Sequence, residues 1–262
     1  MLVDGKAIAA TIEAEVSKQT ARGNRVTMAA ITCAPDFATQ KYLEMKKKRA
    51  AAVGVSLNVV ELPVEAVTDE VITCIKEVSK TCDGVVVQLP LPEQIDKEAV
   101  LKSVPTDKDP DGFSYGFNKK SVLPPVVGAI DEISKLHTVE WKNKRVVVLG
   151  QGTLVGKPAA RYARSKGARV RVYEKGTLDQ TSLKTADIII SGIGQARFIK
   201  PEMIQEGVVL FDAGTSEDGG ELVGDIHTDV ATLAQLLTPV PGGIGPITIA
   251  YLLKNVVELA RA

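Results

Sequence analysis

A tyrosine and a lysine close together can carry out acid–base chemistry, and Tyr42 and Lys46 are such a pair. They stand four residues apart in the segment TQKYLEMKKKRAAAVGV, so a helix would bring them to the same face, one turn apart. A lysine serves as a proton acceptor near neutral pH where a buried site lowers its pKa. The simpler interpretation is a tyrosine and a lysine on an exposed helix face, and the spacing alone favours that interpretation.

The order of the motifs excludes one well-known use of this spacing. Short-chain dehydrogenases have a YxxxK pair in which the tyrosine is the acid or base and the lysine lowers its pKa. In those enzymes the pair follows the cofactor glycines, whereas here Lys46 precedes Gly150, the first candidate glycine. A catalytic role for Tyr42 and Lys46 therefore needs another setting.

Gln88 is a second candidate because of its position in DGVVVQLPLP, residues 83–92. The apolar run before it is typical of a buried strand in a parallel sheet, and the prolines after it end the strand. Open α/β sheets bind ligands outside the carboxyl ends of their strands, which is where Gln88 would lie. The alternative is a glutamine that only caps the strand.

The segment VVVLGQGTLVGKP has the features of a phosphate-binding turn. A strand runs into Gly150, Gly152 and Gly156, and a helix is expected to begin near the third glycine. Glycines allow close approach to a pyrophosphate, and the helix N-terminus offers free N–H groups. The spacing is GxGxxxG, not GxGxxG, and is a weak signal alone. The next strand ends at Glu174, where an acidic residue would hold the ribose hydroxyls of NAD.

The elements that must position these residues alternate along the chain in two series. The pattern predicts α/β architecture with parallel sheets. Residues 104–125, rich in Pro, Gly and Asp, break the alternation and are predicted to be a domain junction that also carries function. The expected helices are 6–19, 39–52, one after Thr68, 128–136, 155–166 and 247–262; the expected strands are 26–33, 56–62, 84–88, 145–150, 169–174, 187–191 and 208–212, with a hairpin or surface excursion in 213–226.

Composition excludes several classes of function. The 262 residues include 32 basic and 32 acidic ones, so nucleic-acid binding has no electrostatic footprint. The N-terminus lacks the features of a signal peptide and no run is long enough to cross a membrane, so a cytoplasmic protein without membrane contact is expected. Cys33, Cys74 and Cys82 have no metal-type spacing and are typical of a reducing compartment. His137 and His227 show no partner pattern, and no metal site is expected.

An ordered set of motifs spans essentially the whole chain from Asp4 onwards. The set comprises YLEMK, VVVQLPLP, DKDPDGF, GxGxxVGKP, VGD and TPVPGGIGPITIAYLL. It resembles the bifunctional methylenetetrahydrofolate dehydrogenase/methenyltetrahydrofolate cyclohydrolase family, and PVPGGIGP together with QLPLP is highly specific for it. The resemblance implies two βαβ domains flanking a cleft, the second a Rossmann-like dinucleotide-binding domain. The first would be residues 1–120 completed by the terminal helix 246–262, the second residues 121–245, with a homodimer formed through the second.

The resemblance also implies a role for each motif residue. Lys46 would be the acid/base group of the cyclohydrolase step, Tyr42 would line the folate pocket, and Gln88 would hydrogen-bond Lys46 and help to hold it neutral. Asp111 would bind the pterin edge. Pro241, Gly242 and Gly243 would let the backbone approach the folate. The NAD or NADP site would comprise Gly150, Gln151, Gly152, Val155, Gly156, Glu174, Lys175, Gly194 and Gly214.

The departures from the family pattern cluster around the cofactor. The family has arginine and serine at the turn and a serine after the next strand to hold the 2′-phosphate of NADP, where this chain has Gln151, Gly152 and the pair Glu174-Lys175. The residues therefore favour NAD, whereas the resemblance favours NADP, and Lys175 could pair with a phosphate. Pro125 replaces a threonine near the nicotinamide. Thr39, where a serine is common, keeps the hydroxyl.

The motifs thus predict oxidation of 5,10-methylenetetrahydrofolate with NAD(P)+ and hydrolysis of the methenyl product to 10-formyltetrahydrofolate. Three alternatives stay open. The first is a cyclohydrolase that has lost hydride transfer, because Pro125 and the altered turn affect only that step. The second is an amino-acid or malic-type dehydrogenase of similar shape, against which QLPLP and PVPGGIGP argue. The third is a catalytically silent binding protein, in which Lys46 or Asp111 would be expected to be lost.

Overall fold

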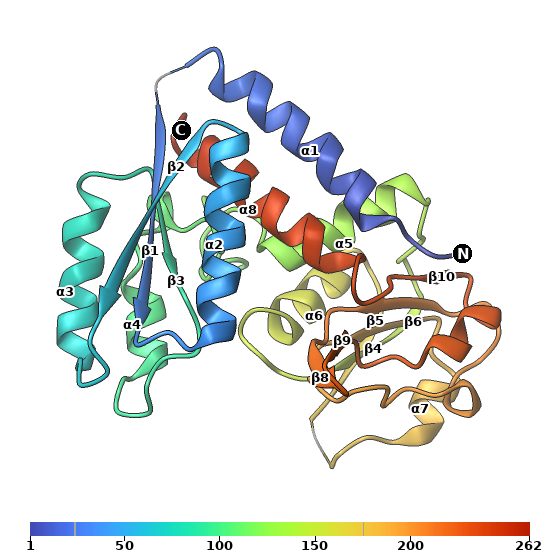
Figure 1. Cartoon of the computed structure of the whole chain (residues 1–262). Helices are drawn as coiled ribbons and strands as arrows, with labels where there is room; N and C mark the ends of the chain where they lie inside the picture. Colours follow the sequence, from blue (N-terminus) through green and yellow to red (C-terminus); the bar gives the residue numbers. More distant parts are fainter. Residues whose placement is uncertain (24, 175) are drawn as a thin grey trace. The chain divides into compact units, whose positions relative to one another are not determined.

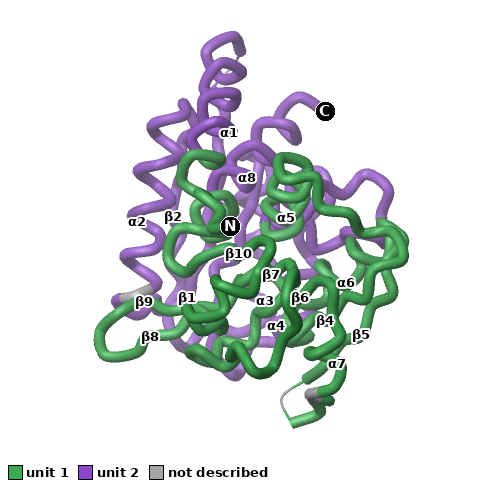
Figure 2. Tube along the Cα trace, turned by 90° about the vertical axis from the view of Figure 1, so that its right-hand side faces the viewer, with its two compact units in different colours: residues 1–9, 126–248 green, residues 10–125, 249–262 purple. Residues whose placement is uncertain are grey.

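The computed structural model describes residues 1–23, 25–174 and 176–262. The chain forms two compact units, shown in different colours in Figure 2. Unit 1 comprises residues 1–9 and 126–248, and unit 2 comprises residues 10–125 and 249–262. Two long helices, α1 (Gly5–Thr20) and α8 (Ile244–Leu259), each supply residues to both units.

Unit 2 is built on a three-stranded parallel sheet with the strand order β2-β1-β3 (Figure 1). In the central strand, Met28 pairs with Leu57 on one side and with Gly84 on the other. The sequence predicted all three strands, because strands buried in a parallel sheet read as nearly continuous apolar runs. Gln88 follows directly after β3. The strands are β1 (Val26–Cys33), β2 (Val55–Leu62) and β3 (Gly84–Val87).

Helices lie on both sides of this sheet. Alternate residues of β1 point to opposite faces, and Ala29, Ile31 and Cys33 form a buried core with Val71 of α3 and Val100 of α4. Figure 1 shows α2 on the other side of the sheet from α3, and α2 packs against β2. The helices of unit 2 are α2 (Phe37–Ala52), α3 (Thr68–Ser79) and α4 (Lys97–Ser103), followed by a single 3₁₀ turn, η1 (Thr106–Lys108).

Unit 1 contains a five-stranded parallel sheet with the order β10-β7-β6-β4-β5. The chain enters the sheet at β4, places β5 on one side of it and then returns to place β6 on the other. This reversal of strand order is the topological switch point at which α/β sheets open a ligand crevice beyond their carboxyl ends. The strands are β4 (Arg145–Leu149), β5 (Arg169–Tyr173), β6 (Ile188–Ser191), β7 (Val209–Asp212) and β10 (Leu236–Leu237).

The rest of unit 1 comprises helices, 3₁₀ turns and a separate two-stranded hairpin. Helix α5 (Pro125–Leu136) begins at a proline, whose fixed φ suits the first turn of a helix. The expected excursion in 213–226 is an antiparallel hairpin of β8 (Ser216–Asp218) and β9 (Glu221–Val223). The remaining elements are α6 (Gly156–Ser165), α7 (Gln180–Lys184), η2 (Pro201–Met203) and η3 (Thr228–Thr232).

Short elements are the ones that the sequence did not predict. Helix α4 has seven residues and α7 has five, and β10 is only two residues long. Such segments are too short to show a hydrophobic period. Among the described helices, none is long and apolar enough to cross a membrane. The cysteines Cys33, Cys74 and Cys82 are all free.

Candidate active site

Helix α2 positions Tyr42 and Lys46. Asp36 caps its N-terminus, because the carboxylate accepts a hydrogen bond from the backbone N–H of Thr39 at 2.8 Å. The helical spacing brings the Lys46 ammonium group over the Tyr42 ring, with Nζ 4.6 Å from the ring centroid. The two residues therefore form one group on one helix face, and that face is not an exposed one.

Gln88 meets Lys46 at the carboxyl end of β3. The Lys46 Nζ donates a hydrogen bond to Gln88 Oε1 at 3.0 Å, and the pair is buried. Two further groups of Gln88 are bonded: its backbone N–H donates to the Ile31 carbonyl at 2.8 Å, and its Nε2 donates to the Leu89 carbonyl at 3.0 Å. The amide is therefore fixed with its oxygen towards the lysine.

Burial sets the electrostatics of this cluster. Lys46 is only 8% exposed, and burial lowers the pKa of its amine, although the Asp111 carboxylate acts in the opposite direction. Burial likewise raises the pKa of Asp111 to about 6, although the positive charge of Lys46 acts to lower it. Burial and the nearby Asp111 raise the pKa of Tyr42 to about 12, so Tyr42 keeps its proton at neutral pH.

The role of Gln88 differs from the expected one. An oxygen acceptor favours the protonated amine, so the amide of Gln88 does not hold Lys46 neutral. Burial is the first cause of the lowered pKa of Lys46. Gln88 thus orients the amine, and the buried position of Lys46 makes that amine a candidate base.

A tight turn carries Asp111 and is tied to the terminal helix. Asn255 of α8 donates hydrogen bonds to the carbonyls of Pro110 and Leu123, both at 2.8 Å. Gly112 has a φ of +66°, and a Cβ there would lie 2.7 Å from the Val122 carbonyl oxygen. Only glycine fits this turn, which accounts for the DG pair in DKDPDGF. Asn255 is a positioning residue that sequence reasoning missed, because its partners are more than 130 positions away.

Asp109 is a second buried carboxyl in the same turn. It is 1% exposed, and its Oδ1 has no hydrogen-bond partner within the described part of the chain. Burial and the neighbouring Asp111 raise its pKa to about 7. Sequence reasoning passed over Asp109, although an aspartate two residues before Asp111 in DKDPDGF was a visible signal.

The raised pKa of Asp109 predicts how stability depends on pH. The folded state binds a proton that the unfolded state releases, so the free energy of unfolding falls as pH rises from about 4 to about 7. We expect Asp109→Asn, which cannot ionise, to resist urea better than the wild type at pH 8 and equally at pH 4. Urea midpoints at pH 4, 6 and 8 measure this. An unchanged midpoint at pH 8 would contradict the assignment.

In unit 1, a pocket of about 480 Å³ opens at the carboxyl ends of β4, β5 and β6. These are the three strands of the topological switch point, so the pocket lies where such sheets bind nucleotides. Its wall is rich in glycine, so backbone N–H groups can approach phosphate oxygens closely. The residues that line it are Gly150, Gln151, Glu174, Gly192, Ile193, Gly194 and Gln195.

The first turn of this pocket depends on two glycines. Gly150 has a φ of +94°, and a Cβ on Gly156 would lie 1.9 Å from the Gly150 carbonyl oxygen. Helix α6 begins at Gly156, so that contact holds the start of the helix against the end of β4. A Cβ on Gly152, by contrast, would meet nothing within 4 Å. The three glycines that the sequence singled out therefore have different roles.

Other predicted nucleotide residues have different surroundings. Val155 packs on Gly192, where a Cβ would lie 2.6 Å from Val155 Cγ1. A Cβ on Gly214 would fall within 2.2 Å of the Asp225 carboxylate, so Gly214 makes room for that side chain. Lys175 lies outside the described residues.

The predicted folate segment Pro241, Gly242 and Gly243 forms a tight turn before α8 in unit 1. The N–H of Gly243 donates to Pro239 at 2.7 Å, and the carbonyl of Gly242 accepts from Gly5 at 2.9 Å. Gly242 has a φ of +105°, which disfavours any residue with a Cβ. A Cβ on Gly243 would lie 2.5 Å from the Pro239 carbonyl oxygen, so both glycines are needed for this turn to pack closely.

Sequence models of two domains account for nearly the whole chain. The catalytic domain of tetrahydrofolate dehydrogenase/cyclohydrolase matches residues 3–111, and the NAD(P)-binding domain of the same enzymes matches residues 124–262. The chain belongs to the tetrahydrofolate dehydrogenase/cyclohydrolase family. A relative from Lactococcus lactis subsp. lactis, named bifunctional protein FolD, is 37% identical over 274 residues, covering 99% of this chain and 96% of that protein.

Solved structures of this family share the fold over the full length. The bifunctional FolD methylenetetrahydrofolate dehydrogenase/cyclohydrolase from Campylobacter jejuni has a TM-score of 0.94 at 31% identity and covers 100% of this chain and 98% of its own. The Trypanosoma brucei enzyme, solved with NADP cofactor and inhibitor, has a TM-score of 0.91 at 32% identity and covers 100% and 97%. The α/β fold with a Rossmann-like second domain, as predicted, is confirmed.

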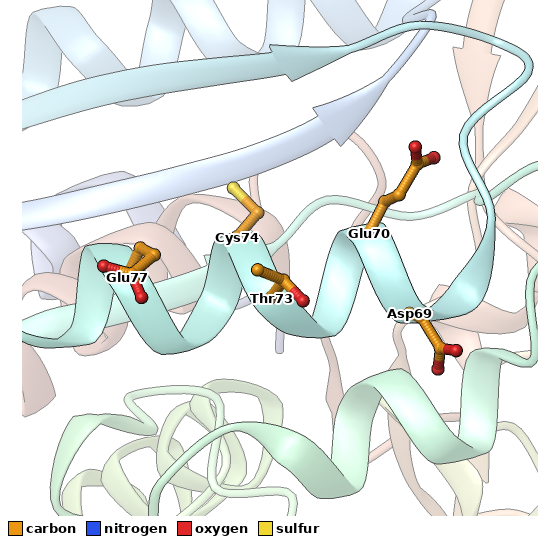
Figure 3. A pocket seen from close by; sticks show the side chains of 5 residues that line it. All are labelled: Asp69, Glu70, Thr73, Cys74 and Glu77. Atoms are coloured by element: carbon orange, nitrogen blue, oxygen red, sulfur yellow. The ribbon is translucent and has the colours of Figure 1, made fainter.

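A further hollow of about 420 Å³ lies along α3. Figure 3 shows its five lining residues on one helix, with the carboxylates of Asp69 and Glu70 pointing away from each other. Glu70 already accepts the backbone N–H of Val67 at 3.0 Å and so caps the helix. Burial raises the pKa of Cys74, which makes its thiol less reactive. Among the described residues, no acidic, histidine or cysteine cluster could hold a metal ion.

Proposed function

We propose that this chain oxidises 5,10-methylenetetrahydrofolate to 5,10-methenyltetrahydrofolate with NAD(P)+ and hydrolyses the product to 10-formyltetrahydrofolate. The observation that carries the proposal is the buried amine of Lys46, held by Gln88 and lowered in pKa by burial. A base of this kind is needed for hydrolysis and has no role in an inert binding protein. The intact motifs of both domains support the pairing of the two activities.

Hydride transfer requires alignment and little acid–base help. The hydride leaves the one-carbon bridge of the folate and the product is a cation, so no strong base takes part. A bound nicotinamide dinucleotide supplies the hydride acceptor. The dinucleotide would be held in the pocket of unit 1 by Gly150, Gln151 and the segment 192–195. The glycines there would let the backbone approach it closely.

Hydrolysis uses the residues of unit 2. Water attacks the methenyl carbon, a C–O bond forms, and the neutral amine of Lys46 accepts the released proton. The carbinolamine then collapses: its hydroxyl gives up a proton as the formyl C=O bond forms, the C–N bond breaks, and the released nitrogen takes up one proton. The net proton of the reaction leaves Lys46 for solvent. Tyr42 remains protonated because its pKa is about 12, so it donates a hydrogen bond and does not act as the base. Asp111, with a pKa of about 6, is mostly ionised and would accept N–H groups of the pterin.

The described residues favour NAD over NADP. Glu174 is exposed at the end of β5 and lines the pocket, where its carboxylate would accept ribose hydroxyls and repel a 2′-phosphate. We expect a higher kcat/KM with NAD+ than with NADP+. Glu174→Gln should raise kcat/KM for NADP+ about tenfold, because one close repulsion of like charges is removed.

Initial rates of methylenetetrahydrofolate oxidation, measured with both cofactors for the wild type and Glu174→Gln, test this preference. Glu217→Gln on the hairpin β8–β9 is the matched control, since Glu217 does not line the pocket. If the wild type reduces NADP+ faster and Glu174→Gln changes nothing, the preference is wrong. If neither cofactor is reduced while methenyltetrahydrofolate is hydrolysed, the chain is a cyclohydrolase alone. A homodimer formed through the nucleotide-binding unit is expected as well, and light scattering measures it.

A further inference from the structure

Asp225 lies behind the nucleotide pocket with both carboxylate oxygens engaged. Its Oδ2 accepts hydrogen bonds from Ser191 Oγ at 2.7 Å and from the backbone N–H of Ile193 at 2.9 Å. Its Oδ1 accepts the backbone N–H of Gln195 at 2.7 Å. Asp225 is 0% exposed and so cannot touch the dinucleotide, yet it holds two residues that line the pocket.

A second aspartate holds Asp225 in place. Asp212, at the end of β7, accepts the backbone N–H groups of Gly214 at 3.0 Å, of Asp225 at 3.2 Å and of Ile226 at 2.9 Å. A Cβ on Gly224 would lie 2.0 Å from Asp212 Oδ2. Gly214 leaves room for the Asp225 carboxylate in the same way that Gly224 leaves room for Asp212. The carboxylates of Asp212 and Asp225 are therefore both closely packed against backbone.

The buried carboxylate of Asp225 lies among N–H and O–H donors. Across residues 1–23, 25–174 and 176–262, no ion pair reaches Asp225. Only N–H and O–H donors compensate its desolvation, and a buried carboxylate without a cation costs stability compared with a well-packed apolar residue. Two backbone N–H groups of the loop and the Ser191 hydroxyl depend on this carboxylate as their acceptor.

The hydrogen bonds leave one N–H group of the loop unused. Within 192–195, the N–H of Gly192 donates to Leu149 at 3.2 Å, and those of Ile193 and Gln195 donate to Asp225. Gly194, with a φ of +65°, lines the pocket, and its N–H has no hydrogen-bond partner in the described part of the chain. The N–H groups of Ile193 and Gln195 thus donate to Asp225, and the N–H group of Gly194 between them does not.

We propose that Asp225 is the positioning residue of the dinucleotide site: it holds the loop 192–195 so that the Gly194 N–H binds an acceptor oxygen of the dinucleotide. The proposal assumes that this pocket binds the nicotinamide cofactor of the proposed function. Ser191 sets the position of the carboxylate from β6, and Asp212 sets it from β7. None of these three side chains lines the pocket.

Asp225→Asn tests the proposal. In either orientation of the asparagine amide, an NH₂ group replaces an acceptor and faces a backbone N–H, of Ile193 or of Gln195. We expect the Kd and KM of the preferred dinucleotide to rise at least about tenfold, with kcat at saturating dinucleotide within about threefold of the wild type. Amide hydrogen exchange of Ile193 and Gln195 should accelerate, and the methenyl hydrolysis rate and the KM for folate should stay within about twofold.

Two further variants separate positioning from general destabilisation. Asp131→Asn removes another buried carboxylate of unit 1, which binds Tyr162 at 2.6 Å and two lysines, and none of these bonds involves the loop. It should lower Tm without changing the Kd of the dinucleotide. Ser191→Ala removes the hydroxyl that positions Asp225 Oδ2 and leaves the carboxylate with both backbone bonds. We expect a smaller rise in Kd, of about threefold, which can be measured even if Asp225→Asn does not fold.

Three results would overturn the proposal. One is unchanged dinucleotide affinity in both Asp225→Asn and Ser191→Ala. Another is an equal rise in Kd for Asp131→Asn, and the third is a parallel loss of hydrolysis in a folded Asp225→Asn variant. If the wild-type protein binds neither NAD+ nor NADP+, the proposed dehydrogenase function is wrong. That result is obtained with the wild type alone and so is distinct from the results for the Asp225 and Ser191 variants.

Discussion

Replacement of Lys46 by methionine is expected to lower the kcat of methenyltetrahydrofolate hydrolysis by about 10³-fold, the range over which a general base acts. Methionine fills much of the same buried space and cannot accept a proton. The amine is the buried group beside Gln88 and Asp111 whose pKa is lowered towards neutrality. Oxidation of methylenetetrahydrofolate should survive with a kcat within about fivefold of the wild type, because hydride transfer needs alignment and not a base.

Lys47→Met is the matched control for this variant. Lys47 is the next residue of α2 and is exposed, so the same substitution there changes the charge of the helix without entering the site. The two half-reactions are followed separately, with added methenyltetrahydrofolate and with methylenetetrahydrofolate plus NAD+. Undiminished hydrolysis in Lys46→Met would remove Lys46 as the base. Loss of both activities, together with a lowered Tm, would instead indicate that the buried amine is needed for folding.

Strands were the most predictable part of the fold. The strand β1 has the predicted bounds Val26–Cys33, and the other core strands differ from prediction by one residue at an end. The cause is physical, since a strand covered on both faces must be apolar at nearly every position. The hairpin of residues 216–223 was also predictable, because its DGG turn contains Gly219 and Gly220 with positive φ values.

The hydrogen-bond networks around the sites could not be predicted in the same way. Asp225 and Ser191 are 34 positions apart, and Asn255 reaches Pro110 across 145 positions. No periodicity links such residues, because their contact exists only after two strands or a helix and a turn have packed. Local pattern therefore identified Gly150, Glu174 and Lys46. The side chains of Ser191, Asp225 and Asn255, which hold the segment 191–195 and the turn before Asp111, became visible only in the fold.

The spacing of Tyr42 and Lys46 shows why a single motif was not enough. Four residues on a helix specify a shared face, but the face can point to solvent or to the core. Lys46 proves to be buried, and Gln88 at the end of β3 accepts its hydrogen bond. The two motifs YLEMK and QLPLP together therefore indicated a site at Lys46, because the first contains the amine and the second contains Gln88, its hydrogen-bond partner.

Substitution of Gly156 by alanine is expected to lower the kcat/KM of the dehydrogenase by about 10²-fold or more, since displacements near 1 Å in a binding site have effects of this size. An added Cβ would lie 1.9 Å from the Gly150 carbonyl oxygen, so the start of α6 must move away from the end of β4. That movement opens the turn that would hold the pyrophosphate. Hydrolysis of added methenyltetrahydrofolate should persist, because Lys46, Gln88 and Asp111 belong to unit 2.

Gly152→Ala provides the sharpest comparison, because it introduces the same methyl group four positions earlier in the same turn. A Cβ there meets no atom within 4 Å, and Gly152 is exposed. If the glycines acted only by making the loop flexible, both variants would lose dinucleotide affinity alike. If Gly156 acts by close packing against Gly150, only Gly156→Ala loses it, while Gly152→Ala keeps its Kd within about threefold unless the dinucleotide itself passes over Gly152. Calorimetric Kd values of both variants, with the hydrolysis rate as the internal control, decide between flexibility and close packing.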